Sequence, residues 1–138
     1  MVVVDGQGIP LGSHIDSASP AEVTLVEKTL EQIKVGRRGR PKTRPKRLIA
    51  DKAYDSDPLR RRLRKRGITL FSPYRKNRKN KRRQDKRMRE RYRRRYKVER
   101  TFAWISSFRR LVIRYDHNLT IYKAFFHLAC VMIVLRRL

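Results

Sequence analysis

The sequence predicts one α/β domain in which antiparallel strands come first and parallel strands with helical crossovers follow. Two short aliphatic runs, Val2–Val4 and 48–50, have the composition of strands. Two further segments carry apolar residues at helical spacing, one starting at Val23 and one containing Leu59 and Leu63. The alternation of these patterns over 138 residues is typical of an α/β layer arrangement of domain size.

The chain is expected to begin with a β-hairpin. Val2–Val4 forms the first strand and 9–17 the second, and residues 5–8 between them have turn composition. His14 falls in the second strand. We expect it on a strand face rather than in a metal site, because no second His or Cys is near it.

A helix is expected to follow the hairpin. Ser19 stands at the N-cap position, Pro20 at the first helical position and Glu22 at the third, which together form a capping pattern. An apolar stripe of helical period then faces the core; its members are Val23, Val26, Leu30 and Ile33. Gly36 is expected to end this helix.

Residues 36–47 form a loop of Gly, Pro and basic residues without periodicity. Such a loop can lie along a nucleic-acid backbone or stay solvated, and the sequence leaves both interpretations open.

A strand buried on both faces is expected at 48–50, with Asp51 at its C-terminal end. Open α/β sheets place their ligands at the carboxyl ends of strands, so Asp51 is a candidate functional acid. It could instead cap the next segment, but Asp55 and Ser56, just before Pro58, are better placed for that role.

A short helix and a strand complete the α/β pattern. The helix carries Leu59 and Leu63 on its inner face and stops at Gly67, and 68–72 has the composition of a strand.

The charge of the chain predicts a polyanionic partner. There are 38 Lys and Arg against 12 Asp and Glu, which gives a formal net charge of +26. The densest part is 75–97, where fifteen of 23 residues are Lys or Arg. We expect a phosphate-binding surface there, with an affinity that falls by about three to five decades between low and moderate salt. Because like charges repel, we do not expect this segment to be helical in the free protein.

Targeting and redox features are absent from the sequence. The start lacks the basic region and long apolar run of a signal peptide. Cys130 has no partner for a disulfide within the chain, and we expect it to be a small buried apolar residue. The last helix, at 120–138, is apolar on nearly all sides, but its apolar stretch is shorter than the roughly twenty residues that a bilayer requires. We therefore expect a cytoplasmic protein without a membrane partner, in which this helix is buried.

A helix is also expected over Tyr92–Leu111, around one carboxylate, Glu99. Helical spacing places Arg95 and Tyr92 on the same face as Glu99. In one interpretation Glu99 makes surface ion pairs, worth about a few tenths of a kcal/mol each. In the other it is an oxygen ligand for a divalent cation, and the arginines hold an anionic substrate such as a phosphodiester. Structural ion pairs are the commoner of the two, and the helix alone does not decide.

Two blocks of sequence carry a family resemblance. They are LIADKAYDSDPLRRRLRKRGI at 48–68 and YKVERTFAWISSFRRLVIRYD at 96–116, with Asp51 and Glu99 separated by 48 positions. In this order, the pair resembles the C-terminal catalytic half of bacterial insertion-sequence transposases of the DDE class, and the resemblance covers nearly the whole chain. It implies a ribonuclease-H-like fold, a mixed sheet with flanking helices, and a DNA transposase that cleaves and joins phosphodiester strands.

The resemblance also implies roles for individual acids. Asp51 is then the second catalytic carboxylate and Glu99 the third, and each holds a Mg²⁺ or Mn²⁺ ion. The family's first catalytic aspartate lies on a strand before the hairpin, and Asp5, in the turn, does not match it. We therefore expect residues 1–138 to be the C-terminal part of a catalytic domain without its first strand, with weak metal binding and little or no catalysis alone.

Other positions are implied to bind DNA, both transposon ends and target. Tyr92 and Arg95 match family positions seven and four residues before the glutamate. Where the family often has a lysine, this chain has Ser106, and Arg109 and Arg110 are expected to make its phosphate contact. A homo-oligomer in a transposition complex is compatible with this assignment.

Two other hypotheses stay open. A non-catalytic basic protein would bind nucleic acid through residues such as Arg82, Arg83 and Arg87, with no metal-linked role for Asp51 or Glu99. The third hypothesis is a remnant that does not fold, because a sheet that lacks a central strand exposes its edges and core.

Overall fold

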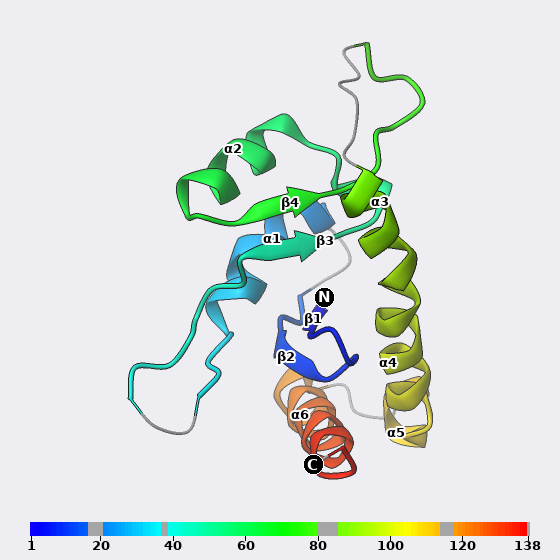
Figure 1. Cartoon of the computed structure of the whole chain (residues 1–138). Helices are drawn as coiled ribbons and strands as arrows, with labels where there is room; N and C mark the ends of the chain where they lie inside the picture. Colours follow the sequence, from blue (N-terminus) through cyan, green and yellow to red (C-terminus); the bar gives the residue numbers. More distant parts are fainter. Residues whose placement is uncertain (17–20, 37–38, 80–85, 114–117, 138) are drawn as a thin grey trace.

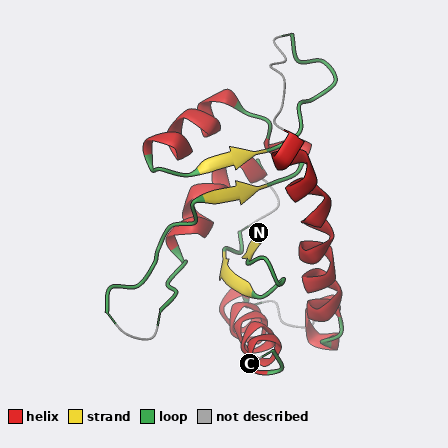
Figure 2. Ribbon diagram, in the orientation of Figure 1, coloured by secondary structure: helices red, strands yellow, loops and turns green. Residues whose placement is uncertain are grey.

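The protein alternates short strands and helices in its first half and is helical in its second half (Figure 1). The computed structural model describes residues 1–16, 21–36, 39–79, 86–113 and 118–137. Its elements are β1 (Val2–Val4), β2 (Pro10–Ser13), α1 (Glu22–Glu31), β3 (Arg47–Ile49), the 3₁₀ turn η1 (Lys52–Tyr54), α2 (Asp57–Lys65), β4 (Thr69–Phe71), α3 (Lys86–Tyr92), the 3₁₀ turn η2 (Arg93–Arg95), α4 (Tyr96–Ser106), α5 (Arg109–Val112) and α6 (Leu119–Leu135). The predicted order of strands and helices is confirmed, and the structure is mixed α/β (Figure 2).

The predicted hairpin is present, with β1 and β2 paired antiparallel and a bulge after Val3. The Asp5 carboxylate closes the turn by accepting hydrogen bonds from the backbone N–H groups of Gln7 at 2.7 Å and Ile9 at 2.9 Å. An Asp side chain that binds the backbone two residues on is typical of tight turns. Asp5 therefore serves the turn, as its position in the sequence indicates.

Helix α4 packs directly on this turn. The hydroxyl of Thr101, which is 1% exposed, donates to the Gly8 carbonyl oxygen at 2.5 Å, and Arg100 Nη2 donates to the Gln7 carbonyl oxygen at 2.7 Å. Gly8 has a φ of +84°, and a Cβ there would lie 3.1 Å from the Lys97 carbonyl oxygen. Glycine permits both the backbone conformation and the close approach of the helix. The first turns of α4 are thereby fixed against the hairpin.

The second pair of strands is parallel, and α2 is the crossover between β3 and β4. Ser56 caps α2 by accepting a hydrogen bond from the Leu59 N–H at 3.4 Å, and Pro58 lies in the first turn. Gly67, with a φ of +74°, stands just past the helix end. The predicted cap, helix and strand are confirmed here, and the carboxyl ends of β3 and β4 lie at one edge.

One core connects the two strand pairs. The stripe predicted for α1 is confirmed, because Val26, Leu30 and Ile33 are at most 3% exposed and Val23 packs against them. The rest of this cluster comes from α2, β4 and the residue before it; its members are Leu59, Leu63, Ile68 and Leu70. Residues of β1, β2 and β3 pack against it as partly buried neighbours. A second, smaller cluster joins α4 to α6 through Ile105, Phe126 and Ile133.

The single mixed sheet expected from the sequence is not observed among the described residues. β1–β2 and β3–β4 form two separate two-stranded sheets that share side-chain packing but no ladder. The expectation that 48–50 is buried on both faces is also wrong. Leu48 and Ile49 are only half-buried, since the part of the chain that the structure describes gives β3 one strand neighbour rather than two.

Several helix predictions need correction. α1 begins at Glu22 with Ala21 at the N-cap and no side-chain cap, and it ends at Glu31 rather than at Gly36; Ser19 lies outside the described residues. The N–H groups of Gln32 and Ile33 bond the carbonyl oxygens three residues back, and Val35 then pairs with Lys42 of the following loop.

The second part of the basic segment, 86–97, is helical, against our expectation, whereas residues 75–79 form a loop. α3 and η2 run into α4, and the basic side chains of this stretch are exposed or half-exposed, so water screens their mutual repulsion. The helix expected over Tyr92–Leu111 is interrupted after Ser106, where α4 ends and α5 begins three residues later.

The last helix is buried on one face only, contrary to the prediction. Phe126, Ala129 and Ile133 face the core, whereas Leu128 is 57% exposed and Leu135 is 61% exposed. The elements that pack on α6 are α4, α5 and β2, and these cover one side of it. Among the described ranges, no helix combines the length and the apolar character that crossing a membrane requires.

Candidate functional site

Asp51 lies at the carboxyl edge of the parallel strands, as the sequence predicts. Its backbone is extended, and its carboxylate accepts a hydrogen bond from the Lys52 N–H at 2.5 Å, so it caps η1. The hydroxyl of Ser72, the residue after β4, donates to the Asp51 carbonyl oxygen at 2.6 Å. The backbone of Asp51 is thus tied to both strands, and its side chain, 43% exposed, faces solvent.

Arg95 joins Asp51 to Glu99. Its Nη2 lies 2.7 Å from Glu99 Oε1, and its Nη1 lies 3.2 Å from Asp51 Oδ2. Glu99 stands in the first turn of α4, the part of the helix that the hairpin fixes. Two acids that are 48 positions apart in the sequence therefore share one guanidinium group.

Tyr92 completes this cluster. Its hydroxyl lies 3.5 Å from Asp51 Oδ1, and its ring packs against Phe71 of β4 with centroids 5.9 Å apart. Partial burial raises the pKa of the Tyr92 phenol above its ordinary value, and the positive charge of Arg95 opposes that shift. The phenol therefore stays protonated at neutral pH and can donate a hydrogen bond at the edge of the acid pair.

The electrostatics of the cluster are those of an open site. Asp51 and Glu99 are 43% and 58% exposed, and the arginine between them is 34% exposed. Ion pairs in such surroundings contribute about 0 to 1 kcal/mol each. The arrangement thus stabilises the fold little, and a different cation can replace the guanidinium at small cost.

The other sequence-predicted DNA contacts lie elsewhere. Arg110 of α5 places its guanidinium over the Phe125 ring of α6, 4.7 Å from the centroid. No contact of the described residues joins Arg109 or Arg110 to the acids, because α4 extends about 10 Å beyond Glu99 before α5 begins. Arg87 is exposed on α3. The remaining pair, Arg82 and Arg83, lies outside the described residues.

Sequence reasoning missed a second carboxylate cluster close to the first. Asp55, which we expected only as a helix cap, places its carboxylate between Arg60 at 3.1 Å and Arg78 at 2.8 Å. The side chain of Asp55 is 2% exposed. A possible indication was the short distance of Arg60 from Asp55 along the chain, but Arg78 belongs to a run of basic residues in which no member stands out.

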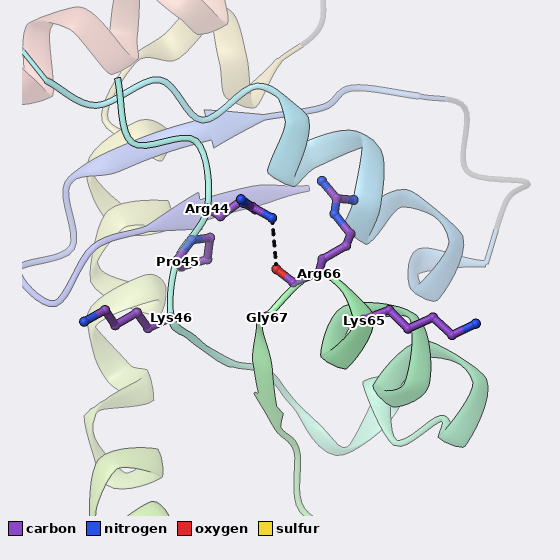
Figure 3. A pocket seen from close by; sticks show the side chains of 6 residues that line it. All are labelled: Arg44, Pro45, Lys46, Lys65, Arg66 and Gly67. Atoms are coloured by element: carbon purple, nitrogen blue, oxygen red, sulfur yellow. Dashed lines mark hydrogen bonds between the residues drawn. The ribbon is translucent and has the colours of Figure 1, made fainter. Parts of the chain in front are cut away.

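A pocket of about 440 Å³ lies at the opposite, amino-terminal edge of the parallel strands (Figure 3). It is lined by Arg44, Pro45, Lys46, Lys65, Arg66 and Gly67. Arg44 Nη1 donates to the Arg66 carbonyl oxygen at 3.5 Å, and the two lysine side chains point away from each other. Its cations do not converge on one point, so the acid cluster remains the better candidate for chemistry.

The donor set of the acid cluster suits a hard divalent cation in part. Within the described ranges, no group of three or more His, Cys, Asp or Glu side chains lies close enough together to hold a metal ion. Asp51 and Glu99 supply carboxylate oxygens on one exposed face. Mg²⁺ is commonly bound by one or two carboxylates while it keeps several waters, so either acid can supply a ligand to such an ion.

Comparison with known proteins identifies the class. A family model described as the transposase DDE domain matches residues 1–134, and the chain belongs to this family. It is 36% identical over 134 residues to a protein of Burkholderia cepacia named "Putative transposase for insertion sequence element IS402". That match covers 96% of this chain and 60% of the relative, so the chain spans less than two thirds of that protein's length. No solved structure matches the chain.

Proposed function

We propose that residues 1–138 form part of a DNA transposase catalytic domain in which Asp51 and Glu99 act as metal-holding carboxylates. The observation that carries this proposal is the shared contact of both acids with Arg95, which unites the two sequence blocks at one edge of the fold. Membership of the transposase DDE domain family supports it. The family as a class uses a divalent metal, and Mg²⁺ or Mn²⁺ suits oxygen ligands of this kind.

Each residue of the cluster has a distinct proposed task. A bound divalent ion would supply activation of the attacking oxygen and stabilisation of the leaving oxygen in phosphodiester cleavage and strand transfer. Asp51 and Glu99 would each hold such an ion. Arg95 would turn from the acids to a DNA phosphate, which its planar guanidinium binds with two hydrogen bonds. Tyr92 would donate its phenolic hydrogen to a phosphate oxygen at the rim.

We infer that a further strand, outside these 138 residues, completes a ribonuclease-H-like sheet. β1 and β3 each have a strand partner on one side only among the described residues, and both sheets pack on one core. A strand inserted between them would give one mixed sheet with flanking helices. The resemblance places the first catalytic aspartate on that strand, and the acid cluster has two of the expected three carboxylates.

The partner of this site is proposed to be DNA, bound as transposon end and as target, in a complex that can contain several copies of the protein. The net charge of +26 supports a polyanionic partner. Helix α3, which carries the exposed Arg87, continues through η2 into α4 (Figure 1), and Glu99 lies in the first turn of α4. The same charge also favours the second candidate, a nucleic-acid-binding protein without metal chemistry.

Binding of Mn²⁺ separates the two candidates. In the 138-residue chain, electron paramagnetic resonance titration should show weak Mn²⁺ binding that Asp51→Asn and Glu99→Gln each remove. Glu31→Gln is the matched control, because Glu31 is an exposed acid at the end of α1, where it pairs with Arg66 rather than with Arg95. Equal Mn²⁺ binding in wild type and both site variants would reject the acid assignment.

DNA cleavage gives the second test. In a chain that includes the proposed further strand, magnesium-dependent plasmid nicking should be lost in Asp51→Asn and Glu99→Gln and kept in Glu31→Gln. If Arg87→Glu abolishes DNA binding while the acid variants change nothing, the binding protein without metal chemistry is the correct function.

A further inference from the structure

A buried carboxylate next to the acid cluster has three donors around it. The Asp55 side chain is 2% exposed, and it accepts hydrogen bonds from Arg78 Nη1 at 2.8 Å, Arg60 Nη2 at 3.1 Å and the Arg75 backbone N–H at 2.9 Å. These donors come from α2 and from the start of the basic segment. A buried charge is tolerated only when it is paired and hydrogen-bonded, and Asp55 meets both conditions.

The Asp55 carboxylate and its three donors are called the hub below. One set of hydrogen bonds connects this hub to Asp51. Arg60 also donates to two backbone carbonyl oxygens at the end of β4, from Nη1 to Leu70 at 3.1 Å and from Nη2 to Ser72 at 2.8 Å. The Ser72 hydroxyl in turn donates to the Asp51 carbonyl oxygen. Asp55 and Asp51 are therefore connected through the carboxyl end of β4 as well as through η1.

A second set of hydrogen bonds connects the hub to the basic segment. Arg75 Nη2 donates to the Ala53 carbonyl oxygen of η1 at 2.7 Å. Arg78 bonds Asp57 at 2.5 Å with its second terminal nitrogen and lies over the Tyr74 ring, 4.6 Å from the centroid. The hydrogen bond from Arg78 lowers the pKa of the exposed Asp57 carboxyl. The first residues of the basic segment are thus fastened to the loop that carries Asp51.

We propose that Asp55 is a positioning residue that holds the Asp51 loop and the first part of the basic segment in one rigid unit. This inference rests on the proposed function. Its consequence is that a DNA strand bound along residues 75–79 is presented in register with the Asp51 and Glu99 carboxylates. Neutralising Asp55 removes the charge that both arginines share, which weakens the link between Arg78 and Arg60. Arg78 still bonds Asp57, but that carboxylate is 58% exposed and forms a weaker pair.

The test compares three variants of the 138-residue chain. Asp55→Asn keeps the shape of the side chain and removes its charge. Asp57→Asn is the matched control, because Asp57 bonds the same Arg78 but is 58% exposed. Leu63→Ala is the stability control, because it opens the core on α2 and leaves the hub intact.

Two readouts distinguish positioning from a general loss of stability. In Asp55→Asn, Mn²⁺ affinity should fall by about tenfold, as for residues that orient metal ligands from outside. The magnitude of the slope of log K for DNA binding against log salt should fall by about one, since one proposed phosphate contact of residues 75–79 is lost. Asp57→Asn should change neither readout. Leu63→Ala should lower the melting temperature and leave both readouts unchanged.

The outcomes separate this inference from the proposed function. If wild type binds Mn²⁺ and DNA, and Asp55→Asn matches Asp57→Asn in both, Asp55 is not a positioning residue. If wild type binds no Mn²⁺, the proposed metal site is wrong. Hydrogen exchange at the Lys52 and Arg75 amides then tests the positioning role of Asp55, with faster exchange expected only in Asp55→Asn. Should Asp55→Asn fail to fold, Arg78→Gln removes the same link from a side chain that is 20% exposed, and the same tenfold loss of Mn²⁺ affinity is expected.

Discussion

Two carboxylate–arginine clusters lie within a few residues of each other, and they differ in burial and in charge balance. In the open cluster one arginine serves two acids, which are 43% and 58% exposed. In the buried cluster two arginines serve one acid, Asp55, which is 2% exposed. Carboxylate and guanidinium groups thus form an exchangeable contact at the surface in one cluster and a fixed, buried contact in the other.

The difference teaches what each cluster can do. Water screens the open cluster, so Arg95 can leave the acids and another cation can take its place. The buried cluster cannot exchange a partner without leaving an uncompensated charge away from water. The open acid pair is therefore suited to bind a ligand. The buried cluster beside it is suited to hold the surrounding loops in a fixed arrangement. The following variants test each part of that contrast.

The largest effect is expected for stability. Asp55→Ala leaves Arg60, 23% exposed, without its carboxylate, and we expect it to reduce the free energy of unfolding by about 3 kcal/mol. Asp51→Ala removes only a partly exposed ion pair and the cap of η1, with an expected loss of about 1 kcal/mol. Denaturant unfolding followed by circular dichroism measures both. Equal losses in the two variants would contradict the contrast between the clusters.

A smaller effect is expected for metal affinity. Arg95→Gln removes the positive charge that competes for the two acids, and at about 4 Å in water that charge is worth about 1 kcal/mol. We therefore expect Mn²⁺ affinity to rise by about fivefold. Arg109→Gln is the control, because Arg109 lies on α5 without a described contact to the acids. An unchanged or lower affinity in Arg95→Gln would mean that Arg95 does not compete for the place of the ion.

The parallel-strand half of the fold could be predicted because its local signals agree with its packing. The apolar runs, the Ser56 cap and the terminating Gly67 each specify the same boundaries that the core requires. The start of α1 was harder to predict. The sequence pattern indicates Ser19 as the N-cap, whereas the N-cap residue is Ala21, which makes no side-chain cap. The exposed face of α6 could not be foreseen, because a sequence shows that a helix is apolar but not which neighbours cover it.

Part of the open cluster could be predicted from the sequence because three of its residues lie close together in the chain. Tyr92, Arg95 and Glu99 recur at helical spacing, so they share a face in any helix, and the resemblance added Asp51. Their chemical roles stay predictions. The buried cluster was hidden, because Asp55 meets Arg78 only through tertiary packing. Composition reports that a segment is basic, and it does not report which of its arginines becomes buried.

The smallest effect concerns Tyr54, which lies on η1 between Asp51 and Asp55 in the sequence. Its hydroxyl bonds Glu22 of α1 and so ties the loop to that helix. Burial raises the pKa of the Tyr54 phenol above its ordinary value of 10.0, and its hydrogen bond to Glu22 Oε2, 2.8 Å long, adds to the shift. A raised pKa means that the folded state favours the neutral phenol. The resulting stability is complete below pH 10.0 and is lost as the pH rises above it.

Tyr54→Phe should therefore reduce the free energy of unfolding at pH 7 by about 0.5 to 1 kcal/mol, the value of one hydrogen bond. Above pH 10.0 the variant should lose stability less steeply than wild type, because it has no phenol to ionise at this position. Denaturant unfolding at neutral and alkaline pH measures both effects, with Tyr96→Phe, at a residue 55% exposed, as the control. If the two variants show the same alkaline profile, the Tyr54 contact does not hold η1 to α1, and the loop that carries Asp51 is fixed by the Asp55 side alone.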